Sequence, residues 1–506
     1  MKKKLISTVL VIVMTLTILP LTGVYASTAP IPSRASSIAF SANPVKIECW
    51  GGYGGSEIPE GTVPFNIDMI DAEDLSNDGE GIYVAVLDTG LLSNYLNFFP
   101  EGQVNVKEEW GLGFSHEVFY DPDGEGNWSI EAGYKFSYKE LNAERGFYTF
   151  DEDNPLWSYY PPLGMWFPFP YGNGHGTHVS SIITGYQFER DDVAFWVRGV
   201  APKITLIPVL VLDDWIVFAD DGNGWWWSGG TNEMVAAGIE YIGWLAEEHD
   251  VKIIVNLSLG GPSPSELIEE AVNYAISQGV IIVASAGNEG YDGMGWPGAY
   301  PQVISCASAG WTGEYLRYYT GDLDPYYWFT DDVPECLWTE DVLGNDFQVY
   351  LSDFSSRPNP DLGQKPWHLD VAAPGAAIKG PYRPEGDPSW YDMTDTRGIW
   401  TVWGTSQAAP HVSGIAAMVL EKYPKANQFT MEMCLKAAGF YNRMTKWREN
   451  ERTATIFDIL DTFDLIDQTW FRNDYGTGLL QADSALFVAK FMFRRCHRGR
   501  HGGRKY

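Results

Sequence analysis

The chain has 506 residues, of which 45% are hydrophobic and 15% aromatic. This composition is enough to bury a large core, and it excludes a chain that is disordered throughout. The formal net charge is −32, from 66 acidic and 34 basic residues. Nucleic acid is excluded as a partner of the main body, because one polyanion repels another.

The N-terminus carries a targeting signal. Lys2, Lys3 and Lys4 precede an apolar run at residues 5–21, and Ala26 ends a small-residue cleavage site. This pattern is typical of a secretory signal peptide at residues 1–26. We expect a secreted, extracellular protein, attached to a membrane or cell surface only if this segment stays uncleaved.

Residues 27–65 are rich in Ser, Pro and Gly, and we interpret them as a linker or a short processed segment. The five cysteines have no CxxC spacing, which argues against a zinc or redox motif. One or two disulfides are compatible with an oxidising compartment, and Cys306 and Cys336 are the closest pair in sequence.

Alternating strands and helices begin with an apolar run at residues 82–87, which predicts a doubly buried parallel strand ending at Asp88. Further strands are expected at residues 204–211, 251–257 and 280–284. The order predicts an α/β fold, a mostly parallel doubly wound sheet with helices on both faces.

One connecting helix has a distinct start signal. The letters SPSE at residues 263–266 form a capping box with a proline at the first helical position. The pattern therefore predicts a helix that is capped by Ser263 and ends at Gly279.

Three aromatic or acidic stretches interrupt the alternation, and we interpret them as long insertions near residues 110–171, 311–350 and 430–474. The first contains DPDGEGN at residues 121–127, which resembles half a calcium loop, although a plain turn is the commoner reading. Residues 494–506 carry six basic residues and no acidic one. This basic tail either solubilises the chain or contacts an acidic surface.

Two histidines follow a glycine-rich turn. His175 and His178 open a short helical pattern that ends at Gly185. Histidines at this spacing can bind metal, but no nearby third ligand completes a zinc set.

A serine stands at the start of the last strongly apolar helix, in GTSQAAPHVSG at residues 404–414. Unpaired backbone N–H groups converge at a helix start, where they can stabilise an oxyanion. A serine there is commonly only a cap. Pro410 inside the helical pattern is a local violation of the kind found at functional sites, and it favours a catalytic role for Ser406.

Five motifs along the chain support the same interpretation. They are VAVLDTG (84–90), HGTHV (175–179), NLSLGG (256–261), AGNEG (286–290) and the serine segment. In this order the chain resembles the subtilisin-like serine proteases, the subtilases, over most of a domain at residues 66–493. The resemblance implies a subtilisin-like fold and a secreted serine endopeptidase.

The resemblance also implies roles for single residues. Ser406 would be the nucleophile, His175 the general base and Asp88 the acid that orients the imidazole. Asn288 would donate its side-chain amide to the oxyanion. The edge segment that binds substrate as an added strand would be formed by Ser258, Leu259, Gly260 and Gly261.

The sequence departs from the family pattern in several places. Gln407 replaces the methionine usual after the nucleophile. Residues 27–65 are short for a folded pro-domain. No metal or other cofactor is required for the chemistry, and structural calcium stays open because the loop at residues 186–193 lacks the usual Asn-rich pattern. Only three acids there could replace it, Glu189, Asp191 and Asp192.

Two rival interpretations remain. The motif Asp88-Thr89-Gly90 also fits a pepsin-like aspartic protease, but that enzyme needs a second such motif, and the sequence has none. The alternative is a catalytically inactive, subtilisin-like binding module of the cell surface. For the enzyme we expect polypeptide substrates and a monomer.

Overall fold

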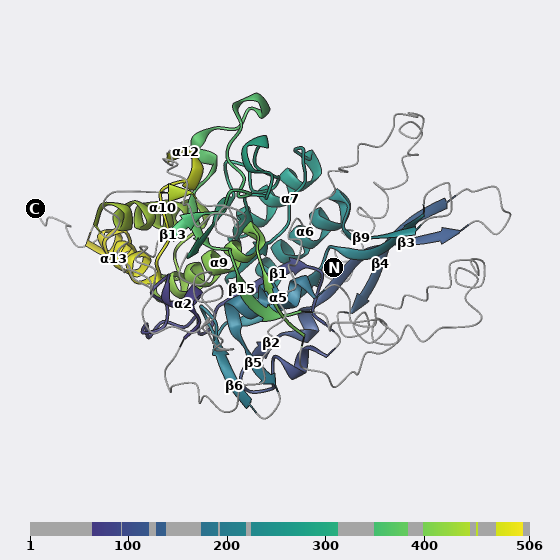
Figure 1. Cartoon of the computed structure of the whole chain (residues 1–506), viewed down its shortest axis with the longest axis horizontal. Coiled ribbons are helices and arrows are strands. Elements are labelled where there is room, and N and C mark those ends of the chain that lie inside the picture. Colours follow the sequence, from purple (N-terminus) through teal and green to yellow (C-terminus); the bar gives the residue numbers. More distant parts are fainter. Residues whose placement is uncertain are drawn as a thin grey trace, which may run out of the picture.

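A computed structural model shows an α/β body (Figure 1). The residues that it describes are 63–92, 94–120, 128–137, 174–190, 193–218, 224–311, 349–382, 398–445, 452–453 and 472–498. The expected signal peptide, most of the expected linker and the calcium-like run at residues 121–127 lie outside these residues. The predictions made for them stay predictions.

The main sheet has 11 strands in the described part of the chain, in the order β17-β13-β12-β11-β10-β1-β7-β3-β4, with β14 beside β12 and β2 beside β7. Its centre is parallel, as the alternating pattern predicts. The central strands are β1 (Tyr83–Asp88), β7 (Thr205–Leu210), β10 (Ile253–Leu257), β11 (Ile281–Ser285), β12 (Ile304–Trp311) and β14 (Val371–Pro374).

Antiparallel pairs lie at the margins of the sheet, where β3 pairs with β4 and β12 with β13. Three separate hairpins pair β5 with β6, β8 with β9 and β15 with β16. The outer strands are β2 (Asn105–Val106), β3 (Leu112–Tyr120), β4 (Trp128–Ser137), β5 (Gly185–Arg190), β6 (Val193–Arg198), β8 (Asp213–Phe218), β9 (Gly224–Gly229), β13 (Val349–Leu351), β15 (Ile378–Pro381), β16 (Ile399–Val402) and β17 (Arg452–Thr453).

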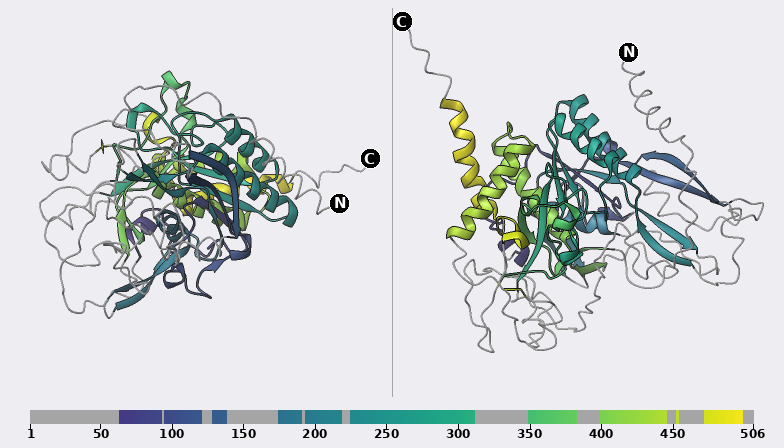
Figure 2. Two further views of the ribbon diagram at one scale, coloured as in Figure 1. Left: turned by 90° about the vertical axis from the view of Figure 1, so that its right-hand side faces the viewer. Right: turned by 90° about the horizontal axis from the view of Figure 1, so that it is seen from above.

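Helices cover both faces of the sheet. On one face α6 and α7 pack against each other and against β10 and β11, and on the other α5 and α9 pack against each other and the sheet (Figure 2). The helices are α2 (Phe65–Asp68), α5 (His175–Thr184), α6 (Asn232–His249), α7 (Glu266–Ser277), α9 (Thr405–Lys422), α10 (Gln428–Thr445), α12 (Arg472–Tyr475) and α13 (Ala482–Arg498). None of the helices in the described ranges is both long and apolar enough to cross a membrane.

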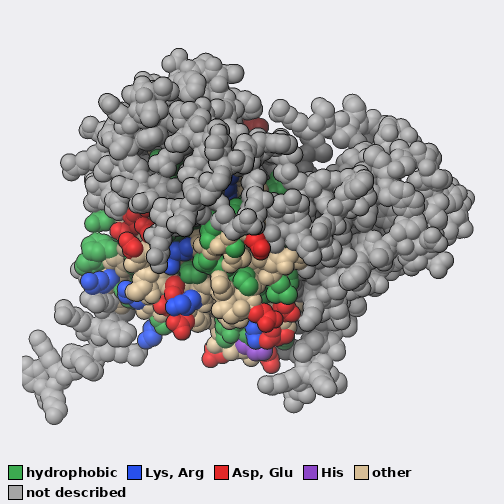
Figure 3. Space-filling view, turned by 60° about the horizontal axis from the view of Figure 1, so that its bottom comes forward, with side chains coloured by type: hydrophobic (Ala, Val, Ile, Leu, Met, Phe, Trp, Pro, Cys, Tyr) green, Lys and Arg blue, Asp and Glu red, His purple; other side chains and the backbone are tan. Residues whose placement is uncertain are grey.

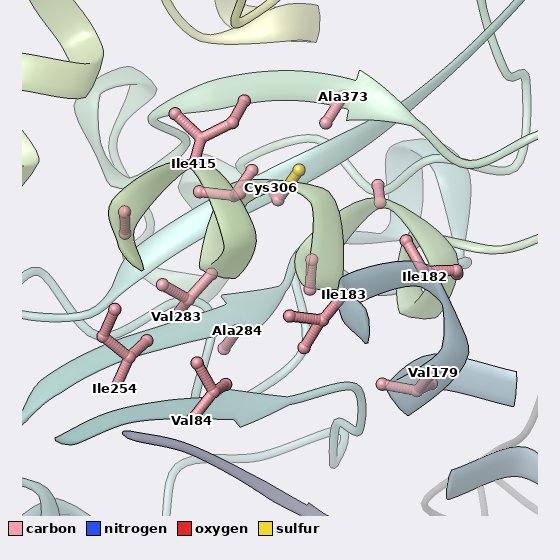
Figure 4. Packing of buried hydrophobic residues seen from close by; sticks show 14 of the residues in the cluster. Val84, Val179, Ile182, Ile183, Ile254, Val283, Ala284, Cys306, Ala373 and Ile415 are labelled. Atoms are coloured by element: carbon pink, nitrogen blue, oxygen red, sulfur yellow. The ribbon is translucent and has the colours of Figure 1, made fainter. Parts of the chain in front are cut away.

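One part of the core lies between the sheet and the helices α5 and α9, and another lies on the face that α6 and α7 cover. Val84, Ile254 and Val283 from three strands meet Ile183 and Ile415 from the two helices (Figure 4). All five side chains are completely buried, and each such burial contributes about 1.5–3 kcal/mol. Because the strands are apolar on both faces, they hold this position only with helices on both sides. At the surface shown in Figure 3, acidic, basic and hydrophobic side chains are interspersed.

Three sequence predictions need correction. Helix α7 is capped by Ser265, whose hydroxyl accepts from the Ile268 nitrogen, so the capping box at Ser263 is wrong by two residues. The part of the chain at residues 428–445, placed mostly in the third insertion, is helix α10, which packs against α13 with Cys434 buried. Helix α13 itself continues to Arg498 and so includes the start of the expected tail.

The cysteines also differ from one expectation. Cys306 and Cys434 are buried free thiols, so Cys306 does not form the pair with Cys336 that sequence proximity suggested. Cys306 lies in β12 with its side chain in the core. In that position the thiol acts as a small apolar side chain.

Candidate active site

The first part of the site is a buried carboxylate–imidazole pair. Asp88 ends β1, and His175 begins α5. The His175 Nδ1 atom lies 2.8 Å from Asp88 Oδ1 and 3.0 Å from Oδ2, and both side chains are almost completely buried. A carboxylate only accepts hydrogen bonds, so the pair fixes the proton on Nδ1 and leaves Nε2 as the basic nitrogen.

A glycine permits this contact. A Cβ atom on Gly176 would lie 2.2 Å from the Gly90 carbonyl oxygen and 3.2 Å from Asp88 Oδ1, which is closer than real side chains approach. The Gly176 nitrogen donates to Thr89 Oγ1 at 2.9 Å. The first turn of α5 therefore packs directly against the end of β1. This contact brings the His175 side chain next to Asp88.

Ser406 lies in the first turn of the neighbouring helix α9, after the N-cap residue Gly404. Proline at position 410 has no N–H, so the Ser406 carbonyl lacks the helical donor four residues on. The Ser258 hydroxyl replaces that donor and lies 2.6 Å from the Ser406 carbonyl oxygen. Pro410 thus frees an acceptor through which helix α9 is joined to the residue that follows β10.

The hydrogen bond between Ser258 and Ser406 belongs to a buried chain of hydrogen bonds. Asn256 Nδ2 donates to the Ser258 hydroxyl at 2.9 Å, and Asn256 Oδ1 accepts from the Ser413 hydroxyl at 2.9 Å. The Ser406 hydroxyl itself donates to the Ser258 carbonyl oxygen at 3.1 Å. All four side chains are buried. The nucleophile candidate is therefore held from both its backbone and its side chain.

Asn288 is positioned by the residue before the serine. Its Oδ1 atom accepts from the Thr405 nitrogen at 2.8 Å and from the Thr405 hydroxyl at 2.9 Å. The same hydroxyl also lies 3.1 Å from the Gly287 carbonyl oxygen. With Oδ1 committed to Thr405, the amide nitrogen of Asn288 is the group left to face a substrate.

The predicted edge segment follows β10. Ser258 and Leu259 are buried, whereas Gly260 and Gly261 are partly exposed. Gly261 exchanges two backbone hydrogen bonds with Trp296, at 2.8 and 2.9 Å. The backbone hydrogen bonds with Trp296 thus hold the segment in place. Because glycine has no side chain, the backbone of Gly260 and Gly261 is partly exposed at the surface.

Two further histidines lie near the site. His178 and His411 are completely buried, and burial lowers the pKa of His178 to about 3 and that of His411 to about 4. His178 Nε2 lies 3.1 Å from the Ile378 carbonyl oxygen. Among the described residues, neither histidine has a carboxylate partner such as the one that His175 has.

No group of three or more His, Cys, Asp or Glu side chains in the described residues could hold a metal ion. Of the three acids weighed for calcium, Glu189 lies exposed on β5, and Asp191 and Asp192 fall outside the described residues. Structural calcium therefore stays untested.

Sequence reasoning singled out Asp88, His175, Asn288 and Ser406. The structure places Asp88 at the end of a strand, His175 and Ser406 in the first turns of helices, and Asn288 in the loop after β11. It missed the positioning residues, Asn256, Thr405 and Ser413. Thr405 and Ser413 lie inside the serine motif, and Asn256 opens the edge motif, so the motifs contained all three. Their roles depend on hydrogen bonds between residues that are more than a hundred positions apart in the sequence. Sequence spacing does not predict such contacts.

Comparisons with known proteins agree on one family. A profile described as "Subtilase family" matches residues 79–439. Subtilisin from Bacillus sp. (strain TA39) is 30% identical over 271 residues, which are 53% of this chain and 51% of the relative. Fervidolysin from Fervidobacterium pennivorans is 30% identical over 324 residues, 62% of this chain and 35% of the relative. The chain thus spans about half or less of the length of these two relatives.

A third relative, subtilisin DY from Bacillus licheniformis, is 30% identical over 318 residues, 62% of this chain and 78% of the relative. Among solved structures, the S41 psychrophilic protease is 22% identical with a TM-score of 0.46, and the match covers 84% of this chain and 99% of that one. Sphericase is 22% identical with a TM-score of 0.44, covering 83% and 98%.

Proposed function

The chain belongs to the subtilase family, and we propose that it is a secreted serine endopeptidase whose nucleophile is Ser406. The observation that carries the proposal is the buried pair of Asp88 and His175, with His175 Nδ1 2.8 Å from the carboxylate. A neutral imidazole held in this way is a general base at neutral pH. Polypeptides are the proposed substrates.

In the proposed reaction, His175 Nε2 takes the proton of the Ser406 hydroxyl as the serine oxygen attacks the peptide carbonyl. Asp88 stabilises the imidazolium that forms, without itself being protonated. His175 then gives the proton to the leaving amine, and an acyl-enzyme remains. Water attacks that ester by the same base catalysis and releases the acid.

Attack places a negative charge on the carbonyl oxygen. Two donors are proposed for it, the Ser406 backbone nitrogen in the first turn of α9 and the Asn288 side-chain amide. Thr405 supports this role because it binds Asn288 Oδ1 and so leaves Nδ2 as the donor. Donors fixed before the reaction stabilise the oxyanion without reorganisation.

The substrate strand would lie along Ser258, Leu259, Gly260 and Gly261. Partial exposure of the two glycines supports this placement, because a peptide backbone can approach them closely. Secretion rests on the signal-peptide pattern at residues 1–26. A monomer and the absence of a required cofactor remain predictions from the sequence.

The test compares Ser406→Ala with the wild-type chain on a peptide substrate, together with labelling by a fluorophosphonate, which reacts with activated serines. We expect labelling at Ser406 alone and a loss of turnover on the order of 10⁶-fold in the variant, the size measured in subtilisin, which is a relative. Ser277→Ala removes an exposed hydroxyl and is the control. Unlabelled, inactive wild-type protein would instead favour a binding module.

A further inference from the structure

The residue after the candidate nucleophile carries an unusual side chain for its surroundings. Gln407 is completely buried, and its Oε1 and Nε2 atoms both lack a hydrogen-bond partner among the described residues. Leaving a buried amide unpaired is unfavourable, because the group loses its hydrogen bonds to water. A buried group in this state calls for an explanation, such as a catalytic role or a bound water or ion.

The amide borders the place where the oxyanion would form. A Cβ atom on Gly404 would lie 2.8 Å from Gln407 Oε1, 3.6 Å from Asn288 Nδ2 and 3.6 Å from the Ser406 nitrogen. The last two atoms are the proposed oxyanion donors. Three polar groups therefore surround one small space above the Gly404 α-carbon, and only glycine at position 404 keeps that space open.

We propose that Gln407 is a third oxyanion donor, which turns its side-chain amide so that Nε2 faces the carbonyl oxygen of the scissile bond. The inference rests on the proposed function, because it concerns the same reaction. Oε1 is an acceptor and would repel the developing negative charge, whereas Nε2 donates to it. A half turn about the Cγ–Cδ bond exchanges the two atoms, and terminal torsions of this kind are soft.

The backbone of Gln407 is already fixed for this task. Its nitrogen donates to the Gly404 carbonyl oxygen at 3.1 Å, and its own carbonyl oxygen lies 2.8 Å from His411 Nδ1. Turning the amide breaks no hydrogen bond to a described residue, since neither amide atom has one to lose. The side chain can therefore respond to the charge at little cost, which a methionine at this position could not do.

The experiment replaces Gln407 by Met, which keeps the volume and removes the amide, and by Glu, which keeps the shape and adds negative charge. Concentrations of active enzyme come from fluorophosphonate titration. We expect Gln407→Met to lower kcat about 10-fold at unchanged KM, less than the 10²–10³-fold loss on removing a main donor, and Gln407→Glu to lower it further. Gln278→Met, at the end of α7, makes the same chemical change away from the site and should leave kcat unchanged.

A second readout separates donation from packing. A hydrogen bond to the acyl-enzyme carbonyl lowers its infrared stretching frequency, so Gln407→Met should raise that frequency and Gln278→Met should not. If Gln407→Met keeps both the wild-type kcat and the wild-type frequency, the third donor is overturned although the protease assignment stands. If the wild-type chain is not labelled at Ser406, the proposed function fails, and this inference fails with it.

Discussion

Two ends of the sheet each bury a carboxylate, and they use it differently. Asp88 ends β1 and is 0% exposed, whereas Asp370 directly precedes β14 and is 2% exposed. The two carboxylates are therefore buried to the same degree. Each also accepts a hydrogen bond of 2.7 Å from a backbone nitrogen: Asp88 from Thr89, and Asp370 from Ser305.

The partners separate the two carboxylates. Asp88 pairs with the His175 imidazole, a side chain that can serve as a proton acceptor and donor in catalysis. Asp370 pairs with the Lys436 ammonium of helix α10, which also lies 2.8 Å from Glu432. An ammonium beside a carboxylate keeps its proton and cannot serve as a base. The first pair is therefore suited to catalysis and the second to joining α10 to the sheet.

Removing the first carboxylate is the largest expected effect. Asp88→Asn should lower kcat about 10⁴-fold, because an asparagine can hold the imidazole in the tautomer with its proton on Nε2. The fold should be retained, since the shape of the side chain is unchanged. Peptide hydrolysis per folded molecule and thermal unfolding measure the two outcomes. Nearly full activity in this variant would show that the pair is structural, like the one at Asp370.

The second carboxylate should give the reverse pattern. Asp370→Ala removes one member of a buried ion pair, leaves Lys436 with Glu432 alone as its carboxylate partner, and leaves the Ser305 nitrogen without its acceptor, which together cost on the order of 1–3 kcal/mol. We expect the free energy of unfolding in denaturant to fall by this amount, while kcat per titrated active site stays near the wild-type value. The loss of stability follows from the hydrogen bonds and the ion pair that Asp370 no longer makes, more than from lost packing.

The matched variant for this pair is Lys436→Met. It removes the charge from the partner, whose side chain is 19% exposed, and keeps much of its volume. Asp370 then stays buried without a cation, and the free energy of unfolding should fall here too. A selective loss of kcat in either variant, with stability retained, would erase the distinction between the two ends of the sheet.

Much of this distinction was predictable from the sequence. The apolar runs place the central strands to within about two residues, because doubly buried strands need unbroken apolar segments. Asp88, His175 and Ser406 follow from short motifs whose glycines and prolines mark unusual backbone. Pro410 is the clearest case, since its missing N–H has a visible consequence in the contact with Ser258.

The rest depends on contacts that local patterns do not encode. No sequence pattern gives Asp370 a role, and its partner Lys436 lies in a stretch interpreted as an insertion. The capping-box pattern indicates Ser263, whereas helix α7 begins at Glu266 after the cap Ser265. The unpaired amide of Gln407 was visible only as a departure from the family pattern.

The smallest expected effect concerns a histidine beside the site that has no carboxylate partner. His411 Nδ1 lies 2.8 Å from the Gln407 carbonyl oxygen, so it carries the proton, and Nε2 accepts from Asn66 Nδ2 at 2.9 Å. A second proton on Nε2 would face the Asn66 amide, which is also a donor. Desolvation by burial lowers the pKa of His411 from 6.5 to about 4. The imidazole is therefore neutral in the folded protein at pH 5.

The sign of the effect follows from that lowered pKa. The unfolded chain takes up a proton on His411 below about pH 6.5, while the folded chain does so only near pH 4. The neutral imidazole thus contributes stability above pH 6.5 that is lost as the pH falls, by about 2 kcal/mol at pH 5. His411→Gln should flatten the decrease in unfolding free energy between pH 7 and 5 by this amount. Asn66→Ala removes the opposing donor but keeps the buried imidazole, so it should keep most of the decrease, because desolvation is the main cause of the lowered pKa. Equal slopes in the wild-type chain and His411→Gln would mean that His411 is already charged when folded, contrary to its position between a carbonyl and an amide donor.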